Sequence, residues 1–553
     1  MISSEKRADV NQNDHLDPIG TDRIQETQET PFTDAVDGDA IRTEVLSVTD
    51  SGAAVVQQQV RFLEVQKSAQ FDYSRSHVTT VVLDSPQSGQ RTVTAQRSDG
   101  VTTTEVCEQT RLLSRETANE AGEYFEQTTF AYDVFNRMVG STDARNGTTA
   151  YTYFADDRIA TITSPDPDPG ASGPGADPQT TAYMYDNDAT VGIRTTVTRP
   201  DGSAFKIHYD SAGREVGRFG AGTNPVFMDY DFAGRLARLT TWQAFDVQTQ
   251  TGVSGEAHTH WVYNAAGLLV QKLDHTGQGP TYVYTDGGRL KRLERARPGS
   301  DGLNPVAIRY DYDPASPTAV LTPEIWRIVY ENDPAGTSPV VFTYDREGRA
   351  VQVQDGSGTR TISYVGGVAA VERYTAGVLD GWGIERELDS EGRMVHLELY
   401  DGSAQDLSVG YRYANMAGEP LGRLDRVLGA GAQWRYTYAA QSRLVTGLTV
   451  SGPAIAPLSH AMSYDFLERL TKRSAAYGGI ERSWTYGYDD LNRRVRGTRE
   501  DGRYWSWSYD ALDQVTGATK RFSDGTLVPG YQFGYTFDEM GNRRETALNA
   551  HSA

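Results

Sequence analysis

Few residues in this sequence have both the types and the spacing that metal binding or nucleophilic catalysis needs. His258 and His260 alternate along the chain, which would place two imidazoles on one face of a strand as a metal-binding pair. No third Cys, His or carboxylate stands at a recognisable ligand spacing, so we interpret the pair as part of an exposed segment leading into a strand. Cys107, the single cysteine, has no neighbouring His or basic cluster to activate its thiol, and we interpret it as a small strand residue.

Calcium binding is the chemistry that the aspartates suggest. Asp166 and Asp168 lie close together in the sequence, but Ca²⁺ needs about six to eight converging oxygens, and turn stabilisation explains these residues without an ion. The motifs of serine hydrolases, P-loop nucleotide-binding proteins, zinc proteases and dinucleotide-binding folds do not occur in the sequence. We therefore predict no metal, no cofactor and no catalytic residue.

Tyrosine and aspartate recur together in a repeated motif, Tyr-Asp followed by two or three residues, Gly or Asn, and then Arg. The step from Tyr209 to Tyr230 is 21 residues and that from Tyr464 to Tyr488 is 24. A period in the low twenties indicates a repeat architecture and not several unrelated domains. The clear copies contain Tyr132, Asp133 and Arg137; Tyr209, Asp210, Gly213 and Arg214; Tyr230, Asp231, Gly234 and Arg235; Tyr344, Asp345, Gly348 and Arg349; Tyr464 and Asp465; Tyr488, Asp489 and Arg493; and Asp538 and Gly541.

The residue types inside the motif predict a strand end, a turn and the start of a returning strand. The Asp can accept hydrogen bonds from backbone amides two residues on, and the Gly or Asn can take a left-handed conformation. A second turn signal follows about 10 to 15 residues later, as at Asn146-Gly147, Asp355-Gly356, Asp401-Gly402, Asp501-Gly502 and Asp524-Gly525. These pairs predict type I′ turns, in which both central residues have positive φ. Each repeat is then two short antiparallel strands with one turn of each kind.

The strands leading into the motif alternate between aromatic and small or polar residues. Trp484, Tyr486 and Tyr488 would share one face, as would Trp505, Trp507 and Tyr509. Successive hairpins would place these side chains in ladders, each cross-strand pair contributing roughly 0.2–1 kcal/mol. Trp242 and Trp382 lie outside these regular rows, and we expect them to be the better candidates for stacking on a ligand such as a sugar ring.

The repeated motif resembles that of the Rhs or YD-repeat family, in which Tyr-Asp is followed by Gly-Arg-Leu. The match extends from about Tyr132 to Arg543. The resemblance implies a long β-sheet ribbon that spirals into a hollow or partial shell. In bacterial Rhs proteins and toxin-complex components that shell encloses a C-terminal toxin, and in teneurins a related barrel belongs to an adhesion receptor. The family's terminal Asp-Pro-x-Gly segment and its autoproteolytic aspartates are not seen here, so self-cleavage and toxicity do not carry over. We expect a truncated product or a fragment.

Composition and charge exclude several classes of function. With 53 Lys and Arg against 74 Asp and Glu, the formal net charge is −21, which disfavours nucleic-acid binding. No apolar run exceeds about four residues, against the roughly 20 that a membrane span requires. One cysteine excludes a disulfide scaffold. The first residues lack the apolar core of a secretory signal, although the family resemblance implies a secreted or cell-surface location.

The chain divides into four parts by composition. Residues 1–40 hold ten acidic and three basic residues and are predicted to be a disordered N-terminal segment. Residues 41–128 are predicted to be degenerate hairpins, with a short helix from Thr110 to Ala121. Residues 129–545 form the repeat array and 546–553 a tail. The Pro- and Gly-rich run 164–175 predicts an exposed loop inserted between repeats.

We predict an all-β fold, a repetitive antiparallel β-hairpin array, and a non-enzymatic structural shell or scaffold. Its partner would be an enclosed or downstream effector domain, or a glycan or protein at a cell surface. The alternative is an adhesion module that binds glycans or proteins. A third hypothesis is a carbohydrate-active enzyme on a parallel β-helix, whose paired carboxylates would lie roughly 5–10 Å apart in the fold and leave no sequence signature. Hairpin turns of two kinds favour antiparallel pairing over that fold.

Overall fold

The computed structural model contains strands, turns and loops, and it describes most of the chain. The described residues are 2–8, 23–34, 38–49, 52–62, 66–72, 75–85, 90–188, 192–298, 302, 304–312, 324–345, 347–365, 367–402, 404–414, 422–453, 455–538 and 541–548. None of them lies in an α-helix. No helix in this part of the chain is long and apolar enough to cross a membrane.

The chain forms two units, each assembled from separate stretches of sequence. Unit 1 comprises Met1–Phe125, Tyr263–Gln271 and Gly279–Trp434, and unit 2 comprises Glu126–Val262, Lys272–Gln278 and Arg435–Ala553. In each unit we call the first long stretch the early segment and the last the late segment. Each unit therefore brings together residues that lie roughly three hundred positions apart in the sequence, for example Arg97 and Glu391 at a separation of 294.

The strands are short and follow one another closely. The first are β1 (Ile2–Ala8), β2 (Arg23–Asp34), β3 (Gly38–Thr49), β4 (Gly52–Phe62), β5 (Gln66–Asp72), β6 (Arg75–Ser85), β7 (Gln90–Arg97), β8 (Thr102–Glu108), β9 (Arg111–Ala118), β10 (Tyr124–Tyr132), β11 (Met138–Asp143), β12 (Gly147–Tyr153), β13 (Ile159–Thr163), β14 (Thr180–Asp188) and β15 (Gly192–Thr198). There follow β16 (Ala204–Tyr209), β17 (Glu215–Gly220), β18 (Thr223–Tyr230), β19 (Leu236–Thr241), β20 (Ala244–Asp246), β21 (Thr251–Ser254), β22 (Ala257–Tyr263), β23 (Leu269–Leu273), β24 (Thr281–Tyr284), β25 (Leu290–Pro298), β26 (Pro305–Asp311), β27 (Arg327–Glu331), β28 (Val340–Tyr344), β29 (Ala350–Asp355) and β30 (Gly358–Val365). The last are β31 (Val368–Gly377), β32 (Gly383–Leu388), β33 (Met394–Asp401), β34 (Ala404–Arg412), β35 (Arg426–Gly429), β36 (Ala432–Tyr438), β37 (Val445–Gly452), β38 (Ile455–Tyr464), β39 (Leu470–Tyr477), β40 (Ile480–Tyr488), β41 (Arg494–Arg499), β42 (Tyr504–Tyr509), β43 (Val515–Arg521), β44 (Leu527–Phe537) and β45 (Arg543–Leu548).

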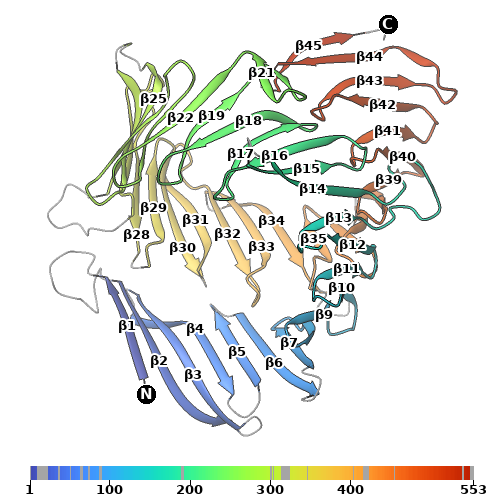
Figure 1. Ribbon diagram of the computed structural model, residues 1–553. Helices are drawn as coiled ribbons and strands as arrows, with labels where there is room; N and C mark the ends of the chain where they lie inside the picture. Colours follow the sequence, from blue (N-terminus) through green and yellow to red (C-terminus); the bar gives the residue numbers. More distant parts are fainter. Residues whose placement is uncertain are drawn as a thin grey trace. The chain divides into compact units, whose positions relative to one another are not determined.

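Consecutive strands pair as antiparallel hairpins. In unit 2, β14 to β19 lie side by side in chain order, and in unit 1 so do β2 to β6 (Figure 1). The predicted all-β fold of antiparallel hairpins is confirmed. The parallel β-helix of the third hypothesis is wrong, because the described ladders of both units run antiparallel.

The pairing register shifts at the repeat tyrosine. The shift lies between His208 and Tyr209 in β16, and between Gly487 and Tyr488 in β40, so that each Tyr pairs with the residue following the turn. A one-residue bulge of this kind accompanies a hairpin turn whose fourth residue is left-handed. The Tyr-Asp motif therefore marks both the turn and the bulge.

Two predicted segments near the N-terminus differ from the structure. The composition predicts that 1–40 are disordered, but 2–8 and 23–34 form β1 and β2. The backbone of β2 pairs with β1 on one side and with β3 on the other. Residues 9–22 and 35–37 lie outside the described residues. The helix predicted from Thr110 to Ala121 is wrong, because β9 occupies most of it and pairs with β8. Cross-strand hydrogen bonds to a neighbouring strand override local helix propensity there.

Among the residues that the structure describes, few side chains are fully buried, and the largest of these is Phe219. Its ring lies against those of Phe227 and Phe245 at centroid distances of 5.9 and 5.2 Å, in an aromatic cluster on unit 2. The predicted aromatic ladders are also present: Phe533 stacks on Trp505 at 6.0 Å and on Tyr535 at 6.5 Å. Packing thus comes from neighbouring strands, as expected for a repeat protein.

Candidate functional site

The Tyr-Asp turn is a five-residue turn that begins at the motif Asp and ends at the motif Arg. At Asp210–Arg214 the Asp210 N–H donates to the Arg214 carbonyl at 2.9 Å, and the Gly213 N–H donates to the Asp210 carbonyl at 3.0 Å. Gly213, the fourth residue, has φ of 78°. The same closure occurs at Asp133, Asp231, Asp345, Asp389 and Asp489, and at Asp538, where the turn ends at Asn542 instead of the motif Arg.

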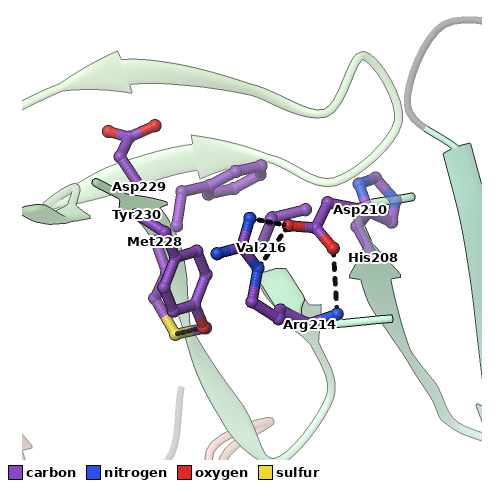
Figure 2. A pocket seen from close by; sticks show the side chains of 8 residues that line it. His208, Asp210, Arg214, Val216, Met228, Asp229 and Tyr230 are labelled. Atoms are coloured by element: carbon purple, nitrogen blue, oxygen red, sulfur yellow. Dashed lines mark hydrogen bonds and ion pairs between the residues drawn. The ribbon is translucent and has the colours of Figure 1, made fainter. Parts of the chain in front are cut away.

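The Asp carboxylate is fully engaged within its own turn. Asp210 Oδ1 accepts the backbone N–H groups of Ala212 and Arg214 at 2.9 and 3.0 Å, and Oδ2 accepts Nε of Arg214 at 2.8 Å. Figure 2 shows this guanidinium against the carboxylate, with Tyr230 beside it. The backbone and side-chain hydrogen bonds from Arg214 lower the pKa of Asp210. Such a carboxylate stays ionised and is a poor proton donor.

The Arg of one turn holds the Tyr of the next repeat. The Arg214 guanidinium lies 4.5 Å from the ring centre of Tyr230, whose hydroxyl donates to the carbonyl of Glu215 at 2.7 Å. Glu215 directly follows Arg214. Both contacts recur between Arg137 and Tyr153, Arg289 and Tyr312, Arg349 and Tyr364, Arg393 and Tyr413, Arg469 and Tyr488, and Arg493 and Tyr509.

These side chains therefore link one repeat to the next at each of these places. Burial raises the pKa of Tyr344, Tyr413 and Tyr509, so that their phenols remain protonated donors. A pocket of about 320 Å³ lies at the Asp210 turn, and its Asp210, Arg214 and Tyr230 are the linked residues just described. The arrangement is suited to connecting one repeat to the next.

The predicted turns at Asp501-Gly502 and Asp524-Gly525 use the same backbone closure as the Tyr-Asp turns. The Arg499 N–H donates to the Arg503 carbonyl at 2.8 Å, and the Gly502 N–H donates to the Arg499 carbonyl at 3.0 Å. Gly502 has φ of 79°, whereas Asp501 is not left-handed. The type I′ prediction is wrong at this turn, because the loop is longer and needs one positive φ only. Here the Asp is the third residue, and Asp501 Oδ1 accepts the Arg503 N–H at 3.0 Å.

The Pro- and Gly-rich run 164–175 is a loop that is exposed over 168–172, as predicted, but it is buried at Pro167 and Gly175, where it packs against the late segment of unit 2. Pro167 is fully buried, and its carbonyl accepts the Phe466 N–H at 3.1 Å. The Gly175 N–H donates to Asp490 Oδ1 at 2.5 Å. A Cβ on Gly175 would lie 2.1 Å from the Tyr488 carbonyl oxygen, so only glycine fits.

We call the contact between early and late segments of one unit the seam. In unit 2, Asn146 Nδ2 donates to Glu468 at 3.0 Å, Gln179 and Asn492 exchange two hydrogen bonds of 2.9 Å, and Arg199 pairs with Asp513 at 2.6 Å. In unit 1, Arg97 pairs with Glu391 at 3.1 Å and Asp99 with Arg393 at 2.7 Å. In unit 2, the early segment thus contributes the loops at the strand ends away from its Tyr-Asp turns. These loops meet the Tyr-Asp turns of the late segment.

The seam residues are those that sequence reasoning missed. Glu468, Asn492 and Asp513 occupy the left-handed fourth position with φ of 62°, 62° and 66°, where glycine is favoured. Each uses its side chain to contact the early segment. A non-glycine residue at the fourth position of a turn in the late segment of unit 2 is the signal that could have indicated this seam.

The histidine pair and the cysteine have structural surroundings. The rings of His258 and His260 lie 5.8 Å apart, and His258 contacts Thr240 at 3.2 Å and Glu256 at 3.3 Å. Cys107 is buried in β8. Across the described ranges, no group of three or more His, Cys, Asp or Glu could hold a metal ion.

The two tryptophans predicted to stack on a ligand lie in different surroundings. The Trp242 ring is half-buried and packs edge-on against Phe227 at 5.2 Å and tilted against Phe245 at 5.5 Å. It belongs to the aromatic cluster of Phe219. Trp382 is half-buried in unit 1, where its carbonyl accepts the Tyr374 N–H at 2.8 Å. Trp242 belongs to unit 2 and Trp382 to unit 1.

The sequence matches no family model and no curated protein. Among solved structures it is similar to the crystal structure of TcdB2-TccC3-TEV, with 11% identity and a TM-score of 0.44, over 96% of this chain and 39% of that one. It is also similar to the Tc holotoxin pore of Photorhabdus luminescens carrying mutant TccC3, with 11% identity and a TM-score of 0.38, over 98% of this chain and 39% of that one. The chain thus spans about two fifths of the length of these proteins. Toxin-complex proteins are among those that the sequence repeats resemble.

Proposed function

We propose that this chain is a non-enzymatic structural scaffold, a ribbon of hairpins that forms the wall of a shell. The carrying observation is that the Asp, Arg and Tyr of the repeats are consumed in linking one repeat to the next. Arg469 is one example: it binds Asp465 in its own turn at 2.6 Å and lies 4.8 Å from the ring of Tyr488 in the next repeat. Residues used in this way provide stiffness and repetition, the properties that a wall requires.

The seam supports the same proposal. Within each unit the early and late segments meet through turns, and their ribbons are joined by ion pairs and reciprocal amide contacts such as Gln179 with Asn492. A ribbon that docks its turns on another stretch of itself can build a wall higher than one strand length. The resemblance of the repeats to the Rhs or YD-repeat family adds the purpose, which is to enclose or present an effector outside the cell or at its surface.

Small-angle X-ray scattering of the purified chain tests the scaffold. A wall around a lumen gives a pair-distance distribution shifted to long distances and a radius of gyration above that expected for a solid globular protein of 553 residues, roughly 24 Å. A value at that compact limit, with a symmetric distribution, would reject the proposal. A matched measurement on a solid globular protein of the same mass fixes the scale.

A further inference from the structure

The ion pair of Arg199 with Asp513 joins two turns of different kinds. Arg199 is the first residue of an Asp-Gly turn, Arg199–Ser203, and its Nη2 donates to Asp513 Oδ2 at 2.6 Å across the seam of unit 2. Asp513 is the left-handed fourth residue of the turn Asp510–Gln514, and its Oδ1 accepts Nη1 of Arg493 at 2.6 Å. Asp513 Oδ1 therefore binds Arg493 of its own segment, and Oδ2 binds Arg199 across the seam. We call the turn Arg199–Ser203, which supplies this Arg, a docking turn.

The docking turn has a short sequence signature, Arg-x-Asp-Gly. It occurs at Arg97-Ser98-Asp99-Gly100 and at Arg199-Pro200-Asp201-Gly202. In both cases the Arg pairs across a seam with an acidic residue of a Tyr-Asp turn, Glu391 in unit 1 and Asp513 in unit 2. Two independent occurrences connect the signature with the contact.

A third copy of the signature is Arg499-Glu500-Asp501-Gly502, in the late segment of unit 2. The N–H of its first residue donates to the carbonyl of its fifth at 2.8 Å, against 2.7 Å in the Arg199 turn. The Arg499 side chain is 32% exposed, against 15% for Arg199. Arg499 forms an ion pair with Glu500 of its own turn at 3.4 Å, and its Nε is buried without a hydrogen bond among the described residues. This docking turn therefore has no acidic turn opposite it in the described chain.

Asp157 is the matching acidic residue, in the early segment of the same unit. It is the fourth residue of the turn Phe154–Arg158, with φ of 67° against 66° for Asp513. Its Oδ1 accepts Nη1 of Arg137, the Arg of the preceding turn, at 2.9 Å, as Asp513 accepts Arg493. The side chain of Asp157 is 73% exposed, against 33% for Asp513. Arg499 and Asp157 thus reproduce the two halves of the Arg199–Asp513 pair.

The neighbouring turns extend the match. Along the seam both segments run in the same direction, because the contacts proceed from Asn146 with Glu468 to Arg199 with Asp513. Placing Arg499 against Asp157 in the same way brings the turns that precede them against each other. In the late segment the preceding turn is flanked by Tyr477 and Ile480, and in the early segment it contains Val134 and Phe135. These four side chains are 59%, 61%, 94% and 72% exposed. An exposed apolar pair would therefore meet another exposed apolar pair.

We propose that a second copy of this chain docks on the first through these two edges, with Arg499 of one copy paired to Asp157 of the other. Both halves belong to one sequence, and the contact reproduces the seam, so a second copy is the occupant that the structure favours. The two surfaces differ, which makes the association head-to-tail and able to continue from copy to copy. This inference goes beyond the proposed shell and does not depend on whether a lumen exists.

Sedimentation velocity over roughly 1–100 µM protein tests the association. We expect species that grow with concentration and shrink at high salt, because an exposed ion pair is screened. Arg499→Asp and Asp157→Arg should each weaken self-association by about tenfold or more, since like charges then face each other. An equimolar mixture of the two variants should recover assembly, because one copy then offers Arg499 to the Asp157 of the other.

Arg238→Asp is the matched control, since Arg238 pairs with Asp229 at 2.7 Å on exposed strand residues and carries the same charge change. It should leave the association unaltered. A single monomeric species at all concentrations would overturn the proposal. So would self-association that neither edge variant weakens, or a mixture of the two variants that stays monomeric.

Discussion

The Arg469 guanidinium lies 4.8 Å from the ring centre of Tyr488, and the Tyr488 hydroxyl donates to the carbonyl of Leu470, the residue after Arg469, at 2.8 Å. The turn Asp465–Arg469 therefore presents a cation and a carbonyl at the spacing that Tyr488 fills. Because both groups come from the turn, the turn also sets the position of its neighbour. This relationship is why one motif can extend a ribbon without a thick core.

Tyr488→Phe should lower the free energy of unfolding by about 1 kcal/mol, the net value of one hydrogen bond whose carbonyl acceptor is left without its partner. Tyr488→Leu should cost more, because it also removes the ring beneath Arg469. Urea denaturation monitored by circular dichroism measures both. Tyr477→Phe is the control, as Tyr477 is 59% exposed. Equal effects at Tyr477 and Tyr488 would contradict the assigned link.

Acid should weaken the ribbon through its turn aspartates. Hydrogen bonds from Arg214 and Arg235 hold the pKa of Asp210 and Asp231 below the ordinary value. A folded-state pKa below the unfolded one gives stability that is complete above the unfolded pKa, about 4, and is lost as the pH falls through the folded pKa. Denaturation midpoints between pH 7 and 3 should fall steeply for the native chain and less steeply after Asp210→Asn with Asp231→Asn. Identical slopes would mean that these carboxylates do not stabilise the turns.

Gly175→Ala should destabilise unit 2 by at least about 2 kcal/mol, because the new Cβ would meet the Tyr488 carbonyl and the backbone is left-handed. Gly173→Ala is the matched control in the same loop: its φ is also positive, but nothing lies within 4 Å of its Cβ position. We expect about 1 kcal/mol there, the left-handed cost alone. Thermal unfolding of both variants measures the difference, which should vanish if the loop does not pack on the late segment.

A double-mutant cycle should detect the seam ion pair. Arg199→Ala and Asp513→Ala should show a coupling free energy of roughly 0.5–1 kcal/mol, since their side chains are 15% and 33% exposed. The Arg238–Asp229 pair, at 45% and 59% exposed, should give a smaller coupling. A coupling of zero for Arg199 and Asp513 would contradict a stabilising contribution of this ion pair to the seam.

The local structure was open to prediction, whereas the contacts between segments were not. The turn at Asp210 could be inferred because Asp, Gly and Arg act within five residues, and the alternation of Trp484, Tyr486 and Tyr488 gives the strand. The Asp501-Gly502 pair suits both a type I′ turn and the longer turn that the structure contains, so the sequence pattern did not separate them. Arg199 and Asp513 lie 314 positions apart, and no local period connects them. Their pairing depends on how the ribbon returns to itself.

A cryo-electron microscopy map of the purified chain tests the central claim most directly. The account predicts a curved ribbon of hairpins around a lumen, with the Arg199 turn resting on the Asp513 turn of the same copy. A solid particle that shows neither a lumen nor an open curved ribbon would contradict it. So would a map in which those two turns are separated.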